Sequence, residues 1–210
     1  MSDLPPHPLH AIVDIQVATS AGWKPLDLAR AFLDGGARLL QLRAKDLPSG
    51  LLLELSDALV ALADDYEAGV IVNDRVDVAR LCGADGVHVG QQDLPPAVAR
   101  EQLGPAAVVG YSTHSVNQVE AALREPISYL AVGPVFGTST KATGYSAVGL
   151  ELVSAAASMA GPMPVVAIGG VTLANAASAI GAGASAVAVI SDLLVGDPFE
   201  RVKAYLRILE

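Results

Sequence analysis

Residues 70–93 read VIVNDRVDVARLCGADGVHVGQQD and contain one complete repeat of the pattern that determines the fold. An apolar run ending at Asn73 is followed by polar residues, an amphipathic stretch and the pair Gly83-Ala84, after which a second apolar run begins at Gly86. Runs rich in Val and Ile are typical of strands covered on both faces, as in parallel sheets. The stretch therefore predicts strand, helix and strand, with Gly83 ending the helix.

The same alternation continues along the whole chain. Eight runs are predicted as strands, namely Leu9–Asp14, Leu39–Arg43, Val70–Asn73, Gly86–Val89, Val108–Tyr111, Tyr129–Val132, Val165–Ile168 and Ala186–Ile190. Helical patterns between them include Leu26–Asp34, Leu51–Asp65, Val116–Leu123, Leu150–Met159, Leu173–Ile180 and Pro198–Leu209. Roughly 26 residues per unit suit an α/β fold of the (β/α)8 TIM-barrel type, with an open sheet as the alternative. Gly-Ala pairs recurring ahead of strands favour the barrel, as one domain over residues 1–210.

The composition excludes several classes of protein. Of the 210 residues 52% are hydrophobic and 17% charged, which allows a large core and argues against disorder. A formal net charge of -9 removes the electrostatic basis for coating nucleic acid. The single cysteine, Cys82, fits a reducing compartment. Since the N-terminal residues resemble no targeting signal, we expect a cytoplasmic protein.

Residues 152–191 carry no ionisable side chain and raise the question of a membrane span. Glycines, prolines and Asn175 interrupt the run, so we expect strand, helix and strand instead. The expected partners are small-molecule substrates, with neither nucleic acid nor membrane, and the sequence leaves homo-oligomer formation open.

Polar residues cluster where the predicted strands end, which is where (β/α)8 barrels carry their chemistry. Gln41, Arg43 and Lys45 alternate with Leu40 and Leu42 at a spacing of two, which places all three on one face of an extended chain. An inward-facing site is favoured over solvated strand ends.

Asp74 and Asp93 follow two neighbouring strands. Two carboxylates from adjacent loops are typical of Mg²⁺ sites, because Mg²⁺ takes its remaining oxygen ligands from water and substrate phosphates. Each aspartate taken singly is better explained as a helix N-cap. Their shared position beside Arg43 and Lys45 favours the metal site.

Two further loops suit phosphate. Thr138, Ser139, Thr140 and Lys141 lie in a long loop after the sixth strand, where an exposed lid without substrate contact is the alternative. Gly169-Gly170 and Ile190-Ser191 follow the last two strands, where backbone N–H groups bind phosphate in this fold; a tight turn alone would also explain the glycines.

The serines and histidines fit structural roles better than a hydrolytic triad. Ser112 ends the fifth strand and is a candidate substrate contact, whereas Ser115 is a predicted helix N-cap. The chain has no G-x-S-x-G motif, which disfavours a nucleophilic serine. His88 is predicted to be a hydrogen-bonded strand residue, and His7 and His10 to belong to a mobile N-terminal segment.

The predicted rim thus has a half with cations and carboxylates and a neutral, glycine-rich half. The first suits Mg²⁺-pyrophosphate and the second a single phosphate. Two phosphorylated substrates, one of which loses pyrophosphate, would fit this arrangement.

Several motifs support this reading, in fixed order from the first strand to the last helix. They are Gln41-Leu42-Arg43-Ala44-Lys45, VNDRVD at 72–77, GADGVHVGQQDL at 83–94, GPVF at 133–136 with Thr138 to Lys141, and AIGGV at 167–171. Together they resemble the thiamine phosphate synthase family.

This resemblance implies a Mg²⁺-dependent transferase that joins hydroxymethylpyrimidine diphosphate to hydroxyethylthiazole phosphate and releases pyrophosphate. The pyrimidine substrate would ionise to a carbocation, which the thiazole nitrogen captures. The resemblance assigns the pyrimidine diphosphate to Gln41, Arg43, Lys45, Asn73, Ser112 and Lys141, and Mg²⁺ to Asp74 and Asp93. It assigns the thiazole phosphate to Thr138, Ser139, Thr140, Gly170, Ile190 and Ser191. Arg43, Lys45, Ser112 and Lys141 are the expected catalytic residues.

Two positions depart from the family pattern. Ala44 replaces a common acidic residue and is expected to point away from the barrel interior, and Gly137 stands where proline is usual. One rival is a thiazole tautomerase of the same superfamily, which intact Asp74 and Asp93 disfavour. The other is a barrel that senses thiamine precursors without turnover.

Overall fold

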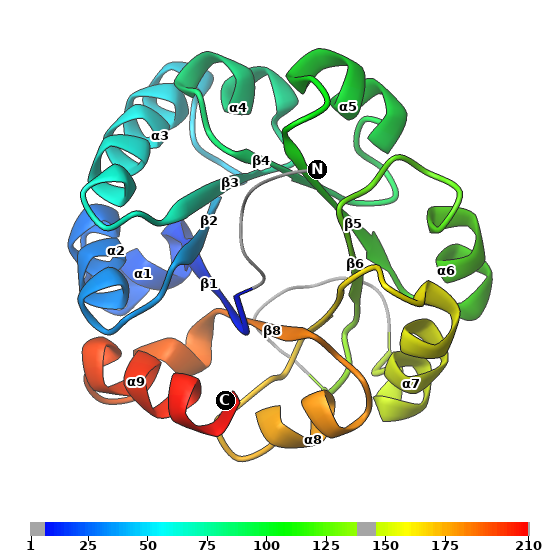
Figure 1. Cartoon of the computed structure of the whole chain (residues 1–210). Coiled ribbons are helices and arrows are strands. Elements are labelled where there is room, and N and C mark those ends of the chain that lie inside the picture. The colour runs from blue at the N-terminus through cyan, green and yellow to red at the C-terminus, as the bar shows by residue number, and fades with distance from the viewer. Residues whose placement is uncertain (1–6, 138–145, 210) are drawn as a thin grey trace.

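The computed structural model describes residues 7–137 and 146–209, in which eight parallel strands form one closed barrel (Figure 1). The strands pair in chain order and β1 closes the ring against β8. They are β1 Leu9–Asp14, β2 Leu39–Arg43, β3 Gly69–Asn73, β4 Gly86–Val89, β5 Val108–Thr113, β6 Tyr129–Val132, β7 Val165–Ile168 and β8 Ala186–Val189. The predicted α/β barrel is confirmed, and the open sheet is excluded.

Helices surround the barrel on the outside (Figure 1). Those described are α1 Ile15–Ser20, α2 Pro25–Asp34, α3 Ser49–Asp64, α4 Val76–Cys82, α5 Pro96–Leu103, α6 Val116–Ala122, α7 Gly149–Ala160, α8 Ala176–Gly181, α9 Pro198–Leu209 and the 3₁₀ helix η1 Ser191–Leu194. Among the described residues no helix is long and apolar enough to cross a membrane. The uncharged run 152–191 instead contains most of α7 and all of β7, α8 and β8.

Alternation along each strand divides the core into two layers. Leu40 and Leu42 of β2 face outward and join the large cluster between strands and helices, which Ala44 also packs against. Ile12, Leu39 and other inward residues form a smaller cluster inside the barrel. Gln41 lies between the two leucines and faces inward, as its two-residue spacing predicts.

Glycines end helices where the Gly-Ala pairs occur. Gly83 caps α4 in the left-handed region at φ 68°, and its N–H donates to the carbonyl of Ala79. Gly36 and Gly183 also have positive φ after α2 and α8. Glycine is thus the C-cap of α2 and α4, as predicted, whereas the C-cap of α8 is Ala182 and Gly183 follows it.

Candidate active site

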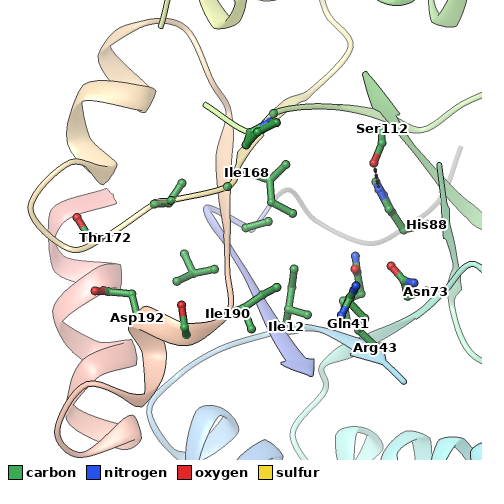
Figure 2. A pocket seen from close by; sticks show the side chains of 18 of the residues that line it. Ile12, Gln41, Arg43, Asn73, His88, Ser112, Ile168, Thr172, Ile190 and Asp192 are labelled. Carbon is green, nitrogen blue, oxygen red and sulfur yellow. Dashed lines mark hydrogen bonds between the residues drawn. The ribbon is translucent and has the colours of Figure 1, made fainter. Parts of the chain in front are cut away.

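A cavity of about 340 Å³ opens where the strands end at their carboxyl side. Figure 2 shows Gln41, Arg43 and Asn73 on one side of it and Thr172 and Asp192 on the other, with isoleucines between them. The lining contains seven of the predicted site residues: Gln41, Arg43, Asn73, Ser112, Gly170, Ile190 and Ser191. The predicted residues Thr138, Ser139, Thr140 and Lys141 lie outside the residues that the structure describes.

Lys45 departs from the predicted arrangement. Strand β2 ends at Arg43, so the alternation that turns Gln41 and Arg43 inward does not extend to Lys45, which lies in a turn. Its side chain is about half exposed and is not part of the cavity lining. The Nζ atom instead lies 3.0 Å from Asp74 Oδ2, at the rim. The prediction that all three side chains share one inward face is therefore wrong for Lys45.

Asp74 and Asp93 meet beside Lys45. Burial raises the pKa of Asp93, and the neighbouring Asp74 carboxylate raises it further. Asp93 Oδ2 also accepts a hydrogen bond of 2.8 Å from the N–H of Gly90. Neither aspartate caps a helix, because the N-cap residues of α4 and α5 are Arg75 and Pro95. The capping alternative is thus wrong.

The aspartate pair meets part of the requirement for a magnesium site. Two carboxylates in one place repel each other, and a bound dication would relieve that repulsion. Asp74 holds φ at 64°, an uncommon conformation for a residue other than glycine, which fits a constrained functional position. No group of three or more His, Cys, Asp or Glu side chains occurs among the described residues, so any ion held here would need oxygens from substrate and water.

Arg43 is held by a residue that the sequence reading did not select. Its Nη1 forms an ion pair with Oδ2 of Asp14, whose side chain is 2% exposed. The other Asp14 oxygen, Oδ1, caps α1 by accepting from the N–H of Val17 at 3.0 Å. Asp14 could have been found, since it is a charged residue at the end of a predicted strand.

His88 connects the cavity to the barrel interior. Its Nε2 lies 2.7 Å from Ser112 Oγ, as Figure 2 shows, and its Nδ1 lies 2.9 Å from the Tyr129 hydroxyl. The prediction of a hydrogen-bonded strand histidine is confirmed. The expectation for His10 is wrong, because His10 lies in β1, is 6% exposed and packs edge-on against Tyr129.

The far side of the cavity is built from backbone turns. Gly169 and Gly170 have φ of 91° and 66°, and a Cβ on Gly170 would lie 2.5 Å from the carbonyl oxygen of Gly137. The Asn175 side chain donates to the Gly170 carbonyl at 3.0 Å. Ser191 begins η1, with one residue between it and the end of β8. The tight-turn explanation of the glycines thus holds, and the same turns form this cavity wall.

Ser115 has the structural role predicted for it. Ser115 is the N-cap of α6, where its hydroxyl accepts from the N–H of Gln118 at 3.3 Å. This confirms the predicted cap.

Comparison with known proteins decides the family. The family model described as thiamine monophosphate synthase matches residues 9–193, which span the barrel from β1 into η1. The chain belongs to the thiamine monophosphate synthase family. Membership gives it an enzymatic, thiamine-phosphate synthase function in thiamine biosynthesis.

Individual relatives of this family agree. The chain is 44% identical to a thiamine-phosphate synthase of Roseiflexus castenholzii, over 82% of this chain and 75% of the relative. It is 40% identical to one of Chlorobium luteolum, over 92% and 91%. A solved thiamine phosphate pyrophosphorylase from Pyrococcus furiosus superposes with a TM-score of 0.85 at 32% identity, covering 96% of this chain and 94% of that one.

Proposed function

We propose that the cavity joins hydroxymethylpyrimidine diphosphate to hydroxyethylthiazole phosphate in a Mg²⁺-dependent reaction that releases pyrophosphate. The observation that supports this proposal is the difference in chemistry between the two sides of the cavity (Figure 2). Amide and guanidinium groups lie on one side, beside the cluster of Lys45, Asp74 and Asp93, and glycine turns with Ser191 lie across from them. Two substrates with different phosphate groups fit this division.

The diphosphate belongs on the basic side. Arg43 presents a planar guanidinium suited to phosphate oxygens, although one of its N–H groups is already engaged by Asp14. Lys45 adds a half-exposed ammonium charge at the rim. Gln41 and Asn73 add amide groups, and Lys141 is proposed to contribute a second ammonium. Together these cations and amides bind the diphosphate, and the cations stabilise the negative charge that develops as it leaves.

Asp74 and Asp93 are the proposed ligands of Mg²⁺. Mg²⁺ held by these residues would neutralise part of the charge of the leaving pyrophosphate. The Lys45 ammonium lies 3.0 Å from Asp74 Oδ2, so it is placed beside the proposed metal ligands and the diphosphate subsite.

The thiazole phosphate belongs on the glycine side. The neighbouring stretch 152–191 carries no ionisable group, so Gly170, Ile190 and Ser191 would bind a monoester through backbone N–H groups and a hydroxyl. Thr138, Ser139 and Thr140 are proposed to complete this subsite.

The chain's residues orient two substrates in this scheme and form no covalent bond with them. The bond between the pyrimidine methylene and the diphosphate oxygen breaks, and its electron pair leaves with pyrophosphate. The thiazole nitrogen then donates its lone pair to the methylene carbocation and forms the new C–N bond. Ile12, Ile168 and Ile190 line the space between the two sides, where apolar contact excludes water that would compete with the thiazole nitrogen.

Incubation of the purified protein with both substrates and Mg²⁺ tests the proposal. Thiamine phosphate and pyrophosphate are expected in equal amounts, and chelation of Mg²⁺ should abolish both. Asp93→Asn should lose most of the activity, whereas Asp77→Asn, which changes an exposed aspartate on α4, should retain it. Binding without product would support a sensor, and Mg²⁺-independent conversion of the thiazole alone would support a tautomerase.

A further inference from the structure

Three side chains from neighbouring strands form a hydrogen-bonded chain that ends at the cavity. Ser112 of β5 lines the cavity and contacts His88 of β4 at 2.7 Å. His88 contacts the hydroxyl of Tyr129, on β6, at 2.9 Å. His88 and Tyr129 are 7% and 5% exposed, so their polar atoms are largely shielded from water and hydrogen bonds within the protein matter to them.

A glycine makes this chain possible. Gly110 lies between the two rings in the sheet, because it is paired with His88 on one side and with Tyr129 on the other. A Cβ at Gly110 would lie 2.3 Å from the Tyr129 hydroxyl oxygen and 2.5 Å from His88 Nδ1. The absence of a side chain there lets β4 and β6 bond directly across β5.

The direction of the hydrogen bonds follows from the buried phenol. Burial raises the pKa of Tyr129, so its hydroxyl keeps its proton and needs an acceptor. Among the described residues the acceptor within reach is His88 Nδ1. In a neutral imidazole the other nitrogen then carries the hydrogen, so Nε2 donates to Ser112 Oγ. With its oxygen accepting from the ring, the Ser112 hydroxyl is left to donate its own hydrogen.

We infer that His88 and Tyr129 are positioning residues that fix Ser112 as a hydrogen-bond donor toward the pyrimidine substrate. This identity of the substrate rests on the function proposed above. Because the Ser112 hydroxyl donates, it should contact a hydrogen-bond acceptor of the substrate, such as a ring nitrogen of the aminopyrimidine. It should not contact the amino group of that ring, which is a donor. The same tautomer prevents Nε2 from removing the Ser112 proton, which separates this contact of serine and histidine from a hydrolytic pair.

Nitrogen NMR of the ligand-free protein tests the tautomer without reference to activity. The His88 ring signals are identified as those missing from His88→Gln. In the wild type Nε2 should be protonated and Nδ1 unprotonated, and Tyr129→Phe should shift this balance toward the other tautomer. A protonated Nδ1 in the wild type, in either the neutral or the cationic ring, would overturn the inference.

A kinetic cycle tests whether Tyr129 acts through Ser112. Tyr129→Phe should raise KM for the pyrimidine diphosphate about tenfold and leave KM for the thiazole phosphate unchanged, as expected for one misdirected hydrogen bond. In Ser112→Ala the further change Tyr129→Phe should have no additional effect. Additive effects, or an unchanged KM in Tyr129→Phe, would show that Tyr129 does not act through Ser112.

A matched control uses the same chemical change elsewhere. Tyr66→Phe removes a hydroxyl that donates to Asp34 on the exposed surface, and it should leave both KM values unchanged. If the wild type forms no thiamine phosphate, the proposed function fails while the NMR result still decides the tautomer.

Discussion

The Arg43 side chain, which lines the cavity, forms an ion pair with Asp14. Asp14 and Arg43 end two neighbouring strands and are paired in register, so the ion pair lies across the wall of the barrel. The Arg43 side chain is 12% exposed, and no hydrogen-bond partner for its Nε occurs among the described residues. Asp14 therefore orients a guanidinium that would otherwise be buried without a counterion.

Asp14→Asn should destabilise the protein by about 3 kcal/mol, because it leaves the buried Arg43 charge unpaired. Asparagine is as good an N-cap as aspartate, so the start of α1 should be preserved. Urea denaturation measures the free energy of unfolding. Asp77→Asn is the control, because its ion pair with Arg75 is exposed and should be worth less than about 1 kcal/mol. Equal losses in the two variants would contradict this account of Asp14.

His10 gives the protein a specific dependence on pH. Burial lowers its pKa to about 3, with smaller contributions from the charges of His88 and His7. The unfolded chain binds a proton near pH 6.5 and the folded chain does not, so stability is lost as pH falls from about 6.5 toward the folded pKa.

Between about pH 7 and about pH 5 this group should cost the wild type about 2 kcal/mol of unfolding free energy. His10→Gln removes the titrating group, so its unfolding free energy should fall by about 2 kcal/mol less than that of the wild type over the same pH interval. Urea titrations of both proteins at the two pH values measure the difference. Equal changes of unfolding free energy with pH in the two proteins would mean that folding does not lower the pKa of His10.

Some of the site residues were placed correctly from the sequence and others were not. Gln41 and Arg43 were predicted because their alternation with leucines lies inside a strand. Lys45 was misplaced because the alternation was extended two residues past the predicted strand end at Arg43, into residues that form a turn. The partners of His88 depend on the register across β4, β5 and β6, which no local pattern encodes.

Asp192 of η1 connects this short helix to α9 through hydrogen bonds. The Asp192 carboxylate accepts from the N–H of Leu173 at 3.1 Å, from Arg201 Nη2 at 2.7 Å and from the Tyr205 hydroxyl at 2.5 Å. It therefore links the loop after β7 and the helix after β8 to the last helix. The arginine also neutralises a carboxylate beside the proposed phosphate subsite.

Arg201→Gln should raise KM for the thiazole phosphate about tenfold, since a charged hydrogen bond is lost and Asp192 becomes an uncompensated negative charge. KM for the pyrimidine diphosphate should not change, because that substrate is proposed to bind across the cavity. Steady-state kinetics with each substrate varied in turn measure both values. Lys203→Gln, which breaks an exposed pair on the same helix, is the control. A rise in both KM values would point to general loosening of the barrel.

The strands were easier to predict than the helices. The strands are largely buried and so consist mostly of apolar residues, whereas α1 and α5 are short and were absent from the predicted helical patterns. The prediction for β5 ended at Tyr111, because Ser112 and Thr113 look like loop residues. Both are paired with β6, and this pairing points Ser112 at His88.

At the scale of the whole molecule, closure of the barrel assembles the site. Groups from β2, β3, β5 and the ends of β7 and β8 meet in one cavity although they are spread along the chain (Figure 2). The order of motifs predicted this meeting, since strand ends in a parallel barrel share one side. The meeting of Asp74 with Asp93 was predicted on the same ground, because they follow neighbouring strands, whereas the size of the cavity required the structure.

The pairing of β1 with β8 also has a consequence during synthesis. On the ribosome the first strand emerges long before its final neighbour, so β1 keeps an open edge until β8 has been made. Unsatisfied backbone groups on such an edge attract other extended chains. The nascent polypeptide thus carries an exposed strand edge until its last strand has been made.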